Sequence, residues 1–321
     1  MQTSASSNAK QFQSFGVLLS SAHKTGLGSS AALVTAFTSA LLAALAKDFD
    51  IAKDRSRIHN LAQAAHCAAQ GKVGSGFDVA AAVFGSCLYR RFSPAILERV
   101  GEPENEDFGH KLHRCVEDLL EDARWDQEVE KDVVNVPKSL RLIMCDVDCG
   151  SQTPGMVKKV LSWRKENPIE ANLLWASIQQ GAEDLCKELT RVTLKDGTSS
   201  ADYTALRDII ETIRSFVREM SEKSQVPIEP KVQTELLDTC ASLPGVINGV
   251  VPGAGGYDAI ALLVENDDEV VQKLGNLLEG WQSSVQEKNP AAKIGKVRLL
   301  DVKQEYEGVR SEEVDRYMLW L

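Results

Sequence analysis

The sequence predicts an α+β protein on two observations. Short apolar runs that favour strands are mixed with longer helical runs, without the regular strand–helix succession of a parallel βαβ sheet. The chain also has 321 residues, 43% of them hydrophobic and 26% charged, which is an ordinary globular composition and long enough for two domains. We place the first domain at residues 1–135 and the second at residues 136–321.

The first domain is predicted to be mainly helical. Residues 29–47 are rich in helix formers and apolar on nearly every side, and residues 54–70 favour a second helix that ends near Gly71. GSCLYRRF (85–92) predicts a strand. Residues 95–135 are acidic and predict a partly helical insertion that lies in solvent.

The second domain is predicted to contain both strands and helices. SLRLIMCDVD (139–148) is apolar enough for a buried strand, and AIALLV (259–264) and KVRLLDV (296–302) predict two more. Residues 171–189 and 200–220 show clean helical spacing between the first strand and the second.

Charge and cysteine content exclude several classes of protein. The net charge of −10 and the pI near 5.2 argue against nucleic acid or an anionic membrane as the main partner. No apolar stretch reaches the roughly 18 residues of a membrane span, and the N-terminus lacks the pattern of a secretory signal. The seven cysteines contain no CxxC pair, so we expect reduced thiols and a cytoplasmic protein.

The stretch HKTGLGSSAALVTA (23–36) predicts a phosphate-binding loop. Gly26 and Gly28 let the backbone approach a ligand closely. Ser29 and Ser30 suit the cap of the following helix, whose N-terminus attracts anions. Lys24 adds a positive charge, and either serine hydroxyl could reach Mg²⁺.

Two other sequence patterns resemble parts of this loop. The P-loop pattern places its lysine after the glycines, so it fails here. The dinucleotide fingerprint matches Gly26, Gly28 and Ala31, but Asp48 and Asp50 follow the helix with no strand before them. The missing strand argues against a dinucleotide-dependent oxidoreductase. A plain helix start with a serine cap stays open.

Two further glycine-rich stretches carry candidate residues. Asp78 follows three glycines in GKVGSGFDVAAAV (71–83), and a plain capping aspartate is an open alternative. PGAGGYDA (252–259) predicts a tight turn before a strand, where small residues allow close approach to a ligand. A plain turn between strands is the alternative there.

Together these three stretches, in this order, resemble the GHMP kinase superfamily. Longer segments, including DVDCGSQTPGMVKKVLSWRKENP (146–168), resemble the eukaryotic, fungal-type phosphomevalonate kinases. The resemblance covers residues 15–302. It implies a GHMP kinase fold, with a ribosomal-S5-like, ATP-binding N-terminal domain that is incomplete here and a ferredoxin-like C-terminal domain.

The resemblance also implies an activity and a set of site residues. The activity is Mg²⁺-dependent transfer of the γ-phosphoryl group of ATP to 5-phosphomevalonate, giving 5-diphosphomevalonate for isoprenoid and ergosterol synthesis, by a monomer or homodimer. It assigns catalysis to Asp78 and Lys24; ATP-phosphate binding to Lys24, Thr25, Gly26, Leu27, Gly28, Ser29 and Ser30; Mg²⁺ binding to Ser30; and substrate binding to Ser75, Gly76, Ser151, Gln152, Thr153, Lys158, Gly253, Ala254, Gly255 and Gly256.

Two departures from the family pattern stand out. Related kinases carry a glutamate for Mg²⁺ on the helix before the catalytic aspartate, where this chain has His66 and Cys67. Nothing in residues 1–22 resembles the family's first motif, PGKxxxxGEY, so we expect an N-terminally truncated domain. The alternative function is therefore a non-catalytic fragment that binds a phosphorylated ligand or a partner chain.

The apolar helix at 29–47 leads to the first prediction. Its faces require a sheet to cover them, and each large side chain left bare forfeits about 1.5–3 kcal/mol, against a typical total stability of about 5–15 kcal/mol. We expect the 321-residue chain alone to fold poorly or to be inactive, as measured by thermal unfolding, sedimentation and ADP release. A monomeric, cooperatively melting and active preparation contradicts this.

Overall fold

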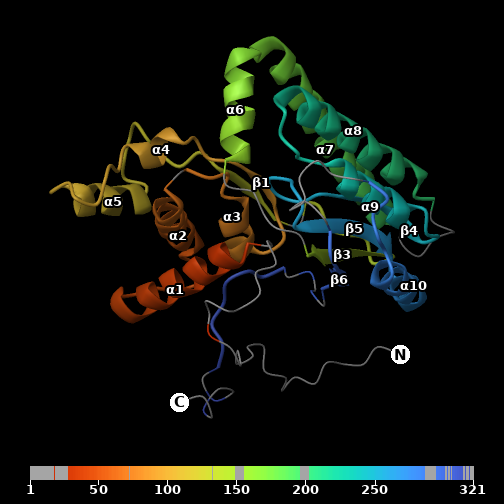
Figure 1. Cartoon of the computed structure of the whole chain (residues 1–321). Helices are drawn as coiled ribbons and strands as arrows, with labels where there is room; N and C mark the ends of the chain where they lie inside the picture. Colours follow the sequence, from red (N-terminus) through yellow and green to blue (C-terminus); the bar gives the residue numbers. More distant parts are fainter. Residues whose placement is uncertain are drawn as a thin grey trace. The chain divides into compact units, whose positions relative to one another are not determined.

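The computed structural model describes residue 18, residues 28–71, 73–131, 133–148, 155–195, 202–285, 294–300 and 306–313, and residues 302, 304, 315 and 318. The chain divides into two compact units, residues 1–131 with 305–321, and residues 132–304 (Figure 1). No helix in these described stretches is both long enough and apolar enough to cross a membrane.

Unit 1 is built from short helices and one small ladder of strands. Its elements are α1 (Ser29–Leu45), α2 (Arg55–Gln70), α3 (Phe77–Phe84), β1 (Leu88–Arg90), α4 (Ala95–Glu98), α5 (Phe108–Val116) and β2 (Glu128–Glu130). Strands β1 and β2 pair antiparallel. The two predicted helices are confirmed, while the predicted strand at 85–92 shortens to three residues.

The acidic stretch 95–135 has a core of its own. Ile96, Leu97, Val100 and Cys115 pack with Phe92 in one buried cluster. The expectation of a solvated insertion is therefore only partly met, because these apolar residues are buried while others, such as Leu119, are exposed.

Helix α1 has an inverted distribution of polar and apolar side chains. Its buried residues are Ala31, Thr35, Thr38 and Ser39. Four large apolar side chains spaced by four residues form an exposed stripe, with exposed fractions of 57% for Leu33, 64% for Phe37, 43% for Leu41 and 79% for Leu45. The sequence predicts burial on more than one face, and in the described part of the chain this stripe stays uncovered.

The C-terminal segment returns to unit 1, which differs from the predicted second domain of 136–321. The N–H of Val309 donates to the carbonyl of Val83 at the end of α3, at 3.2 Å. A Cβ atom on Gly308 would lie 2.4 Å from that same carbonyl oxygen, and one on Gly85 would lie 2.5 Å from the backbone of Tyr306. Two glycines thus allow backbone to pack directly on backbone there.

Unit 2 is a sheet covered by helices. Its elements are β3 (Leu140–Val147), α6 (Met156–Glu166), α7 (Pro168–Lys195), α8 (Thr204–Ser224), α9 (Lys231–Ala241), β4 (Val246–Val250), β5 (Ala259–Glu265), α10 (Asp268–Glu279) and β6 (Val297–Leu299). The strand order is β4-β5-β3-β6 with every pair antiparallel. A strand–helix–strand–strand–helix–strand succession in this order is ferredoxin-like, as expected for the second domain.

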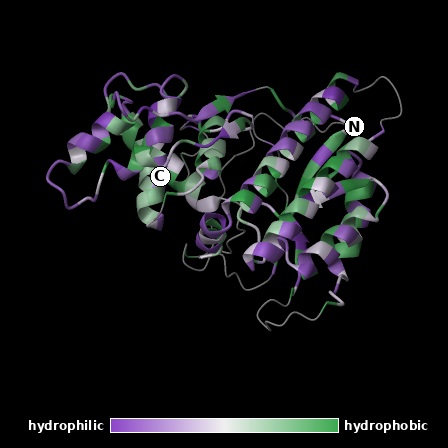
Figure 2. Cartoon of the chain, turned by 90° about the horizontal axis from the view of Figure 1, so that it is seen from above, coloured by the Kyte–Doolittle hydropathy of each residue, from purple (hydrophilic) through white to green (hydrophobic). Residues whose placement is uncertain are grey.

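The two faces of this sheet pack against different helices. Ile260, Leu262 and Val264 of β5 lie in the cluster that contains residues of α9 and α10. Leu263, which points the opposite way because side chains alternate along a strand, lies in the cluster with α7 and α8. In Figure 2 the long helices on the right carry both hydrophobic and hydrophilic colours, as helices with one buried face do.

A buried ion pair joins two helical regions of unit 2. Arg214 of α8 and Glu229, just before α9, are each 1% exposed, and their nearest nitrogen and oxygen lie 2.8 Å apart. The carboxylate of Glu229 also accepts hydrogen bonds from Arg218 at 3.1 Å and from the Thr234 hydroxyl at 3.0 Å. Several charge-assisted hydrogen bonds thereby compensate the cost of burying these charges.

Removing one partner tests this pair. Arg214→Met should lower the free energy of unfolding by about 3–5 kcal/mol, because Glu229 keeps a buried charge with fewer donors. Urea denaturation followed by circular dichroism measures it. Lys273→Met is the control, since Lys273 pairs with Glu269 on the exposed face of α10 and should change stability by no more than about 0.5 kcal/mol. Equal losses in both variants would contradict the assignment.

Candidate functional site

The first turn of α1 directly follows the glycine-rich loop. Gly28 is the N-cap residue, with φ of 79° in the left-handed region that glycine adopts without strain. The expectation of a serine cap is wrong, because Ser29 and Ser30 occupy the first two helical positions and no described side chain caps α1. Both serines are exposed. The first-turn N–H groups of α1 are therefore available to an anion.

Asp78 lies in the first turn of α3. The N-cap of this helix is Gly76, with φ of 81°, so the alternative of a capping aspartate is not what the structure shows. One carboxylate oxygen of Asp78 accepts from the N–H of Val79 at 3.0 Å, and the side chain is 22% exposed. The carboxylate therefore stands at the surface of a helix N-terminus, where a negative charge is favoured.

Gly76 is held against two polar side chains. A Cβ atom at this position would lie 2.6 Å from Oε1 of Gln63 and 2.8 Å from the hydroxyl of Tyr89. That hydroxyl donates to the carbonyl of Ser75 at 3.3 Å, and burial raises the pKa of Tyr89 to about 12, so it stays a donor at neutral pH. The turn at Ser75 and Gly76 thus packs against Gln63 of α2 and Tyr89 of β1.

The N-termini of α1 and α3 meet. A Cβ atom on Gly28 would lie 3.4 Å from the Cβ of Asp78, which is ordinary van der Waals contact. Two helix N-termini, each with unpaired N–H groups and a positive dipole end, therefore share one place with the Asp78 carboxylate. The structure brings together Gly28, Ser30 and Asp78, which the sequence predicts as site residues.

His66 of α2 lies between the two helices. Its Nε2 is 3.2 Å from the hydroxyl of Ser30 and 3.9 Å from a carboxylate oxygen of Asp78. The amide nitrogen of Gln70 lies 2.9 Å from the same Nε2. From the sequence, His66 stands out only as a departure from the family pattern, and these contacts are not predicted.

A signal for His66 does exist in the sequence of α2. His59, Gln63 and His66 are spaced by four and three residues, which puts them on one face of a helix. All three are buried, at 0%, 0% and 5% exposure. Polar residues on the core-facing side of a helix require partners. For His66 the nearby polar groups include Ser30 and Asp78, two residues of the candidate site.

The glycine-rich turn of unit 2 packs against the segment before α9. Gly253, Gly255 and Gly256 have φ values of 69°, 81° and 109°. The N–H of Gly256 donates to the carbonyl of Ile228 at 2.8 Å. A Cβ atom on Gly255 would lie 2.4 Å from that carbonyl oxygen. Only a turn of small residues fits there, and this packing is also what the plain turn that the sequence leaves open requires.

The same turn lies beside the start of α6. A Cβ atom on Gly256 would be 3.8 Å from the sulfur of Met156, the first residue of that helix. Lys158 follows two residues later and is exposed, and Ala254 is exposed in the turn itself. Met156 therefore contacts the glycine turn, and no described contact joins Lys158 to it.

The other predicted site residues lie outside the described residues. They are Lys24, Thr25, Gly26 and Leu27 of the loop, and Ser151, Gln152 and Thr153 before α6. Their assigned roles stay predictions.

No group of three or more His, Cys, Asp or Glu side chains in the described residues could hold a metal ion. Mg²⁺ does not require such a group beside a nucleotide, because it keeps several waters and binds through phosphates and one or two protein ligands. The exposed hydroxyl of Ser30, close to Asp78, fits this minimal set.

The free thiols of the six described cysteines agree with reduced cysteines.

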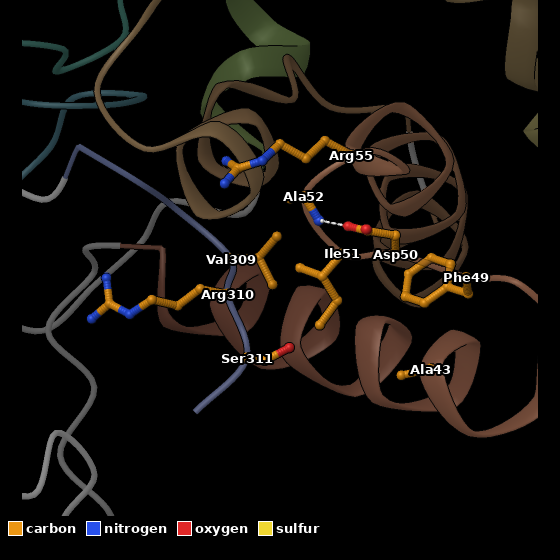
Figure 3. A pocket seen from close by; sticks show the side chains of 9 residues that line it. All are labelled: Ala43, Phe49, Asp50, Ile51, Ala52, Arg55, Val309, Arg310 and Ser311. Atoms are coloured by element: carbon orange, nitrogen blue, oxygen red, sulfur yellow. Dashed lines mark hydrogen bonds between the residues drawn. The ribbon is translucent and has the colours of Figure 1, made fainter. Parts of the chain in front are cut away.

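A cavity of about 430 Å³ opens elsewhere in unit 1 (Figure 3). It lies between the α1–α2 connection and the C-terminal segment, and Ile51, Arg55 and Val309 are among its lining residues. The Arg55 guanidinium is already engaged with the carbonyls of Val83 and Glu307. None of the predicted site residues lines this cavity.

Comparison with known proteins identifies the family. Residues 13–86 match the model of the GHMP kinases N terminal domain. The chain is 51% identical over 316 residues to the phosphomevalonate kinase of Aspergillus fumigatus, covering 98% of this chain and 65% of that protein. It is 51% identical over 315 residues to that of Gibberella zeae, covering 97% of this chain and 67% of that protein. The chain belongs to the phosphomevalonate kinase family.

Membership in the phosphomevalonate kinase family confirms the resemblance seen in the sequence. The fold is likewise similar to a solved structure, the Streptococcus pneumoniae phosphomevalonate kinase, with a TM-score of 0.53 at 19% identity over 78% of this chain and 66% of that chain. This agrees with the α+β GHMP kinase fold. The chain spans about two thirds of the length of the two fungal relatives.

The glycine turn of unit 2 leads to a test of its packing. Gly255→Ala should lower the free energy of unfolding by about 1–3 kcal/mol, because the new methyl group meets the Ile228 carbonyl and the left-handed backbone is strained. Urea denaturation measures the change. Gly280→Ala is the control, since nothing lies within 4 Å of a Cβ atom there and its φ is −103°. The packing is misassigned if Gly255→Ala is as stable as Gly280→Ala.

Proposed function

We propose that this chain carries the phosphoryl-transfer site of a phosphomevalonate kinase, which moves the γ-phosphoryl group of ATP to 5-phosphomevalonate. The observation that supports this most is the meeting of the α1 and α3 N-termini at Gly28 and Asp78. A Cβ atom added to Gly28 would lie 3.4 Å from the Cβ of Asp78. Such a place suits the phosphates of a nucleotide. Its occurrence in an ATP-using kinase family supports ATP as that nucleotide.

The chemistry asks the protein mainly for position and charge. An oxygen of the acceptor phosphate bonds to the γ-phosphorus, the bond from that phosphorus to the β–γ bridging oxygen breaks, and ADP leaves with the electron pair. The acceptor is already an anion, so a strong base is less necessary than in a kinase that phosphorylates an alcohol. Asp78 then orients a cation or takes a residual proton from the acceptor.

The proposal assigns supporting groups in both units. In unit 1 the first-turn N–H groups of α1 bind phosphate, and Ser75 and Gly76 border the substrate. The Ser30 hydroxyl would hold Mg²⁺, which neutralises phosphate charge when bound. In unit 2 the turn from Gly253 to Gly256 and the Lys158 ammonium bind the anionic substrate. Lys24, Thr25, Gly26 and Leu27 complete the ATP loop, and Ser151, Gln152 and Thr153 the substrate side.

The remaining parts of the proposal concern the cell. Free thiols at the described cysteines support a cytoplasmic protein. We propose a monomer or homodimer with small-molecule substrates. The uncovered apolar stripe of α1 favours one alternative, a chain that binds a phosphorylated ligand or a partner chain without turning over.

The deciding experiment measures ADP release by the purified chain with Mg-ATP and 5-phosphomevalonate, with mevalonate as the control substrate. Activity with the phosphorylated substrate alone supports the proposal. If the chain releases no ADP, a longer form with an extended N-terminus is assayed in the same way, and activity of that form supports the site assignment. If neither form releases ADP, the non-catalytic alternative is favoured.

Asp78→Asn should lower the turnover number by about 10²-fold or more, within the range for a positioned acid–base group. The active form identified above is used, and ADP release is the measurement. Asp107→Asn is the matched control, because Asp107 is a carboxylate of unit 1 that is 57% exposed and pairs with Lys111 on the surface. A variant with full turnover removes Asp78 from the mechanism.

A further inference from the structure

One ring nitrogen of His66 is surrounded by three polar groups from three helices. They are the Ser30 hydroxyl of α1 at 3.2 Å, the Gln70 amide nitrogen of α2 at 2.9 Å, and the Asp78 carboxylate of α3 at 3.9 Å. The histidine is 5% exposed. A buried nitrogen with one bonding direction cannot serve all three groups equally, so their chemistry decides the arrangement.

Donor and acceptor properties limit this ring to two arrangements. With the ring hydrogen on Nδ1, the single lone pair of Nε2 accepts from the Ser30 hydroxyl and is shared with the Gln70 amide. With the hydrogen on Nε2, the ring donates to Ser30 and the Gln70 side chain turns its carbonyl oxygen to the ring. Ser30 can contact an unprotonated Nε2 favourably only by donating its hydroxyl hydrogen. The Asp78 oxygen, at 3.9 Å, is beyond hydrogen-bond distance.

The first arrangement, with the hydrogen on Nδ1, has a consequence for Ser30. A serine hydroxyl has one hydrogen and two acceptor lone pairs. Once the hydrogen points to His66, both lone pairs are free for a divalent cation, and rotation of the hydroxyl is restricted. Asp78 is likewise left without a hydrogen bond to the ring, so its outer oxygen stays available to the reacting groups.

We propose that His66 is a positioning residue that accepts the Ser30 hydroxyl hydrogen and so prepares that oxygen to bind the divalent cation of the nucleotide. This inference rests on the proposed function and adds to it a role for His66. A group that orients a metal ligand in this way typically contributes about 10–100-fold in metal affinity.

The first experiment measures the affinity of the purified chain for ATP by calorimetry, with Mg²⁺ and with EDTA. The ratio of the two affinities is compared across variants. His66→Leu removes the acceptor and should reduce the ratio about tenfold or more, while His66→Gln keeps an acceptor and should stay within about threefold of the original chain. His59→Leu is the control, because His59 is 0% exposed on the same helix and contacts Asn60 instead.

Thermal unfolding shows whether each variant folds. His66→Leu with an unchanged ratio overturns the inference, and so does an equal loss in His66→Leu, His66→Gln and His59→Leu, which indicates a packing effect. An original chain whose ATP affinity does not respond to Mg²⁺ overturns the proposed metal chemistry and this inference together.

A second measurement is independent of ATP. Two-bond ¹⁵N–¹H spectra of histidine-labelled chain report which ring nitrogen carries the hydrogen. We expect the His66 hydrogen on Nδ1, and a shift of the Nε2 resonance in Ser30→Ala. A hydrogen on Nε2, or a resonance unmoved by Ser30→Ala, overturns the assignment whatever the kinase activity turns out to be.

Discussion

A Cβ atom at position 28 would lie 3.4 Å from the Cβ of Asp78, so the backbone of α1 reaches the first turn of α3 with only a glycine between them. The rest of unit 1 depends on this approach. Gly76 lets α3 begin against Gln63 and Tyr89, and α2 supports both helices from below. Each glycine sits where a left-handed backbone and a close neighbour coincide, so neither constraint alone explains the sequence.

Unit 2 meets a similar demand with charge. The glycine turn is bonded to the carbonyl of Ile228, and the next residue, Glu229, is held by Arg214, Arg218 and Thr234. The segment between α8 and α9 has no regular structure, and these bonds fix it at the Ile228 carbonyl and at the Glu229 side chain. Buried ion pairs add little net stability compared with apolar packing, but they do fix geometry. Fixed geometry is what a turn that approaches a ligand needs.

Much of the fold could be predicted from the sequence, because its signals are local. The apolar run at 139–148 contains β3, and the helix formers from Ser29 onward give α1 to within two residues. The contacts of His66 could not be predicted in this way, because Ser30 lies 36 residues away and no periodicity reports on tertiary neighbours. The return of Gly308 and Val309 to Val83 is hidden for the same reason, since it depends on backbone packing with no apolar pattern.

The polarity of α1 and α2 connects these points. In α1 the large apolar side chains face outward and Thr35, Thr38 and Ser39 are buried. In α2 the buried face carries His59, Gln63 and His66. A helix normally buries its apolar side, so α1 is inverted. In α2 the polar residues share the buried face with Ile58, Ala62 and Cys67, so that helix is not inverted. The apolar stripe of α1 is free to pack against a second surface. A surface that packs on Phe37 would hold the same helix whose first turn carries Ser30.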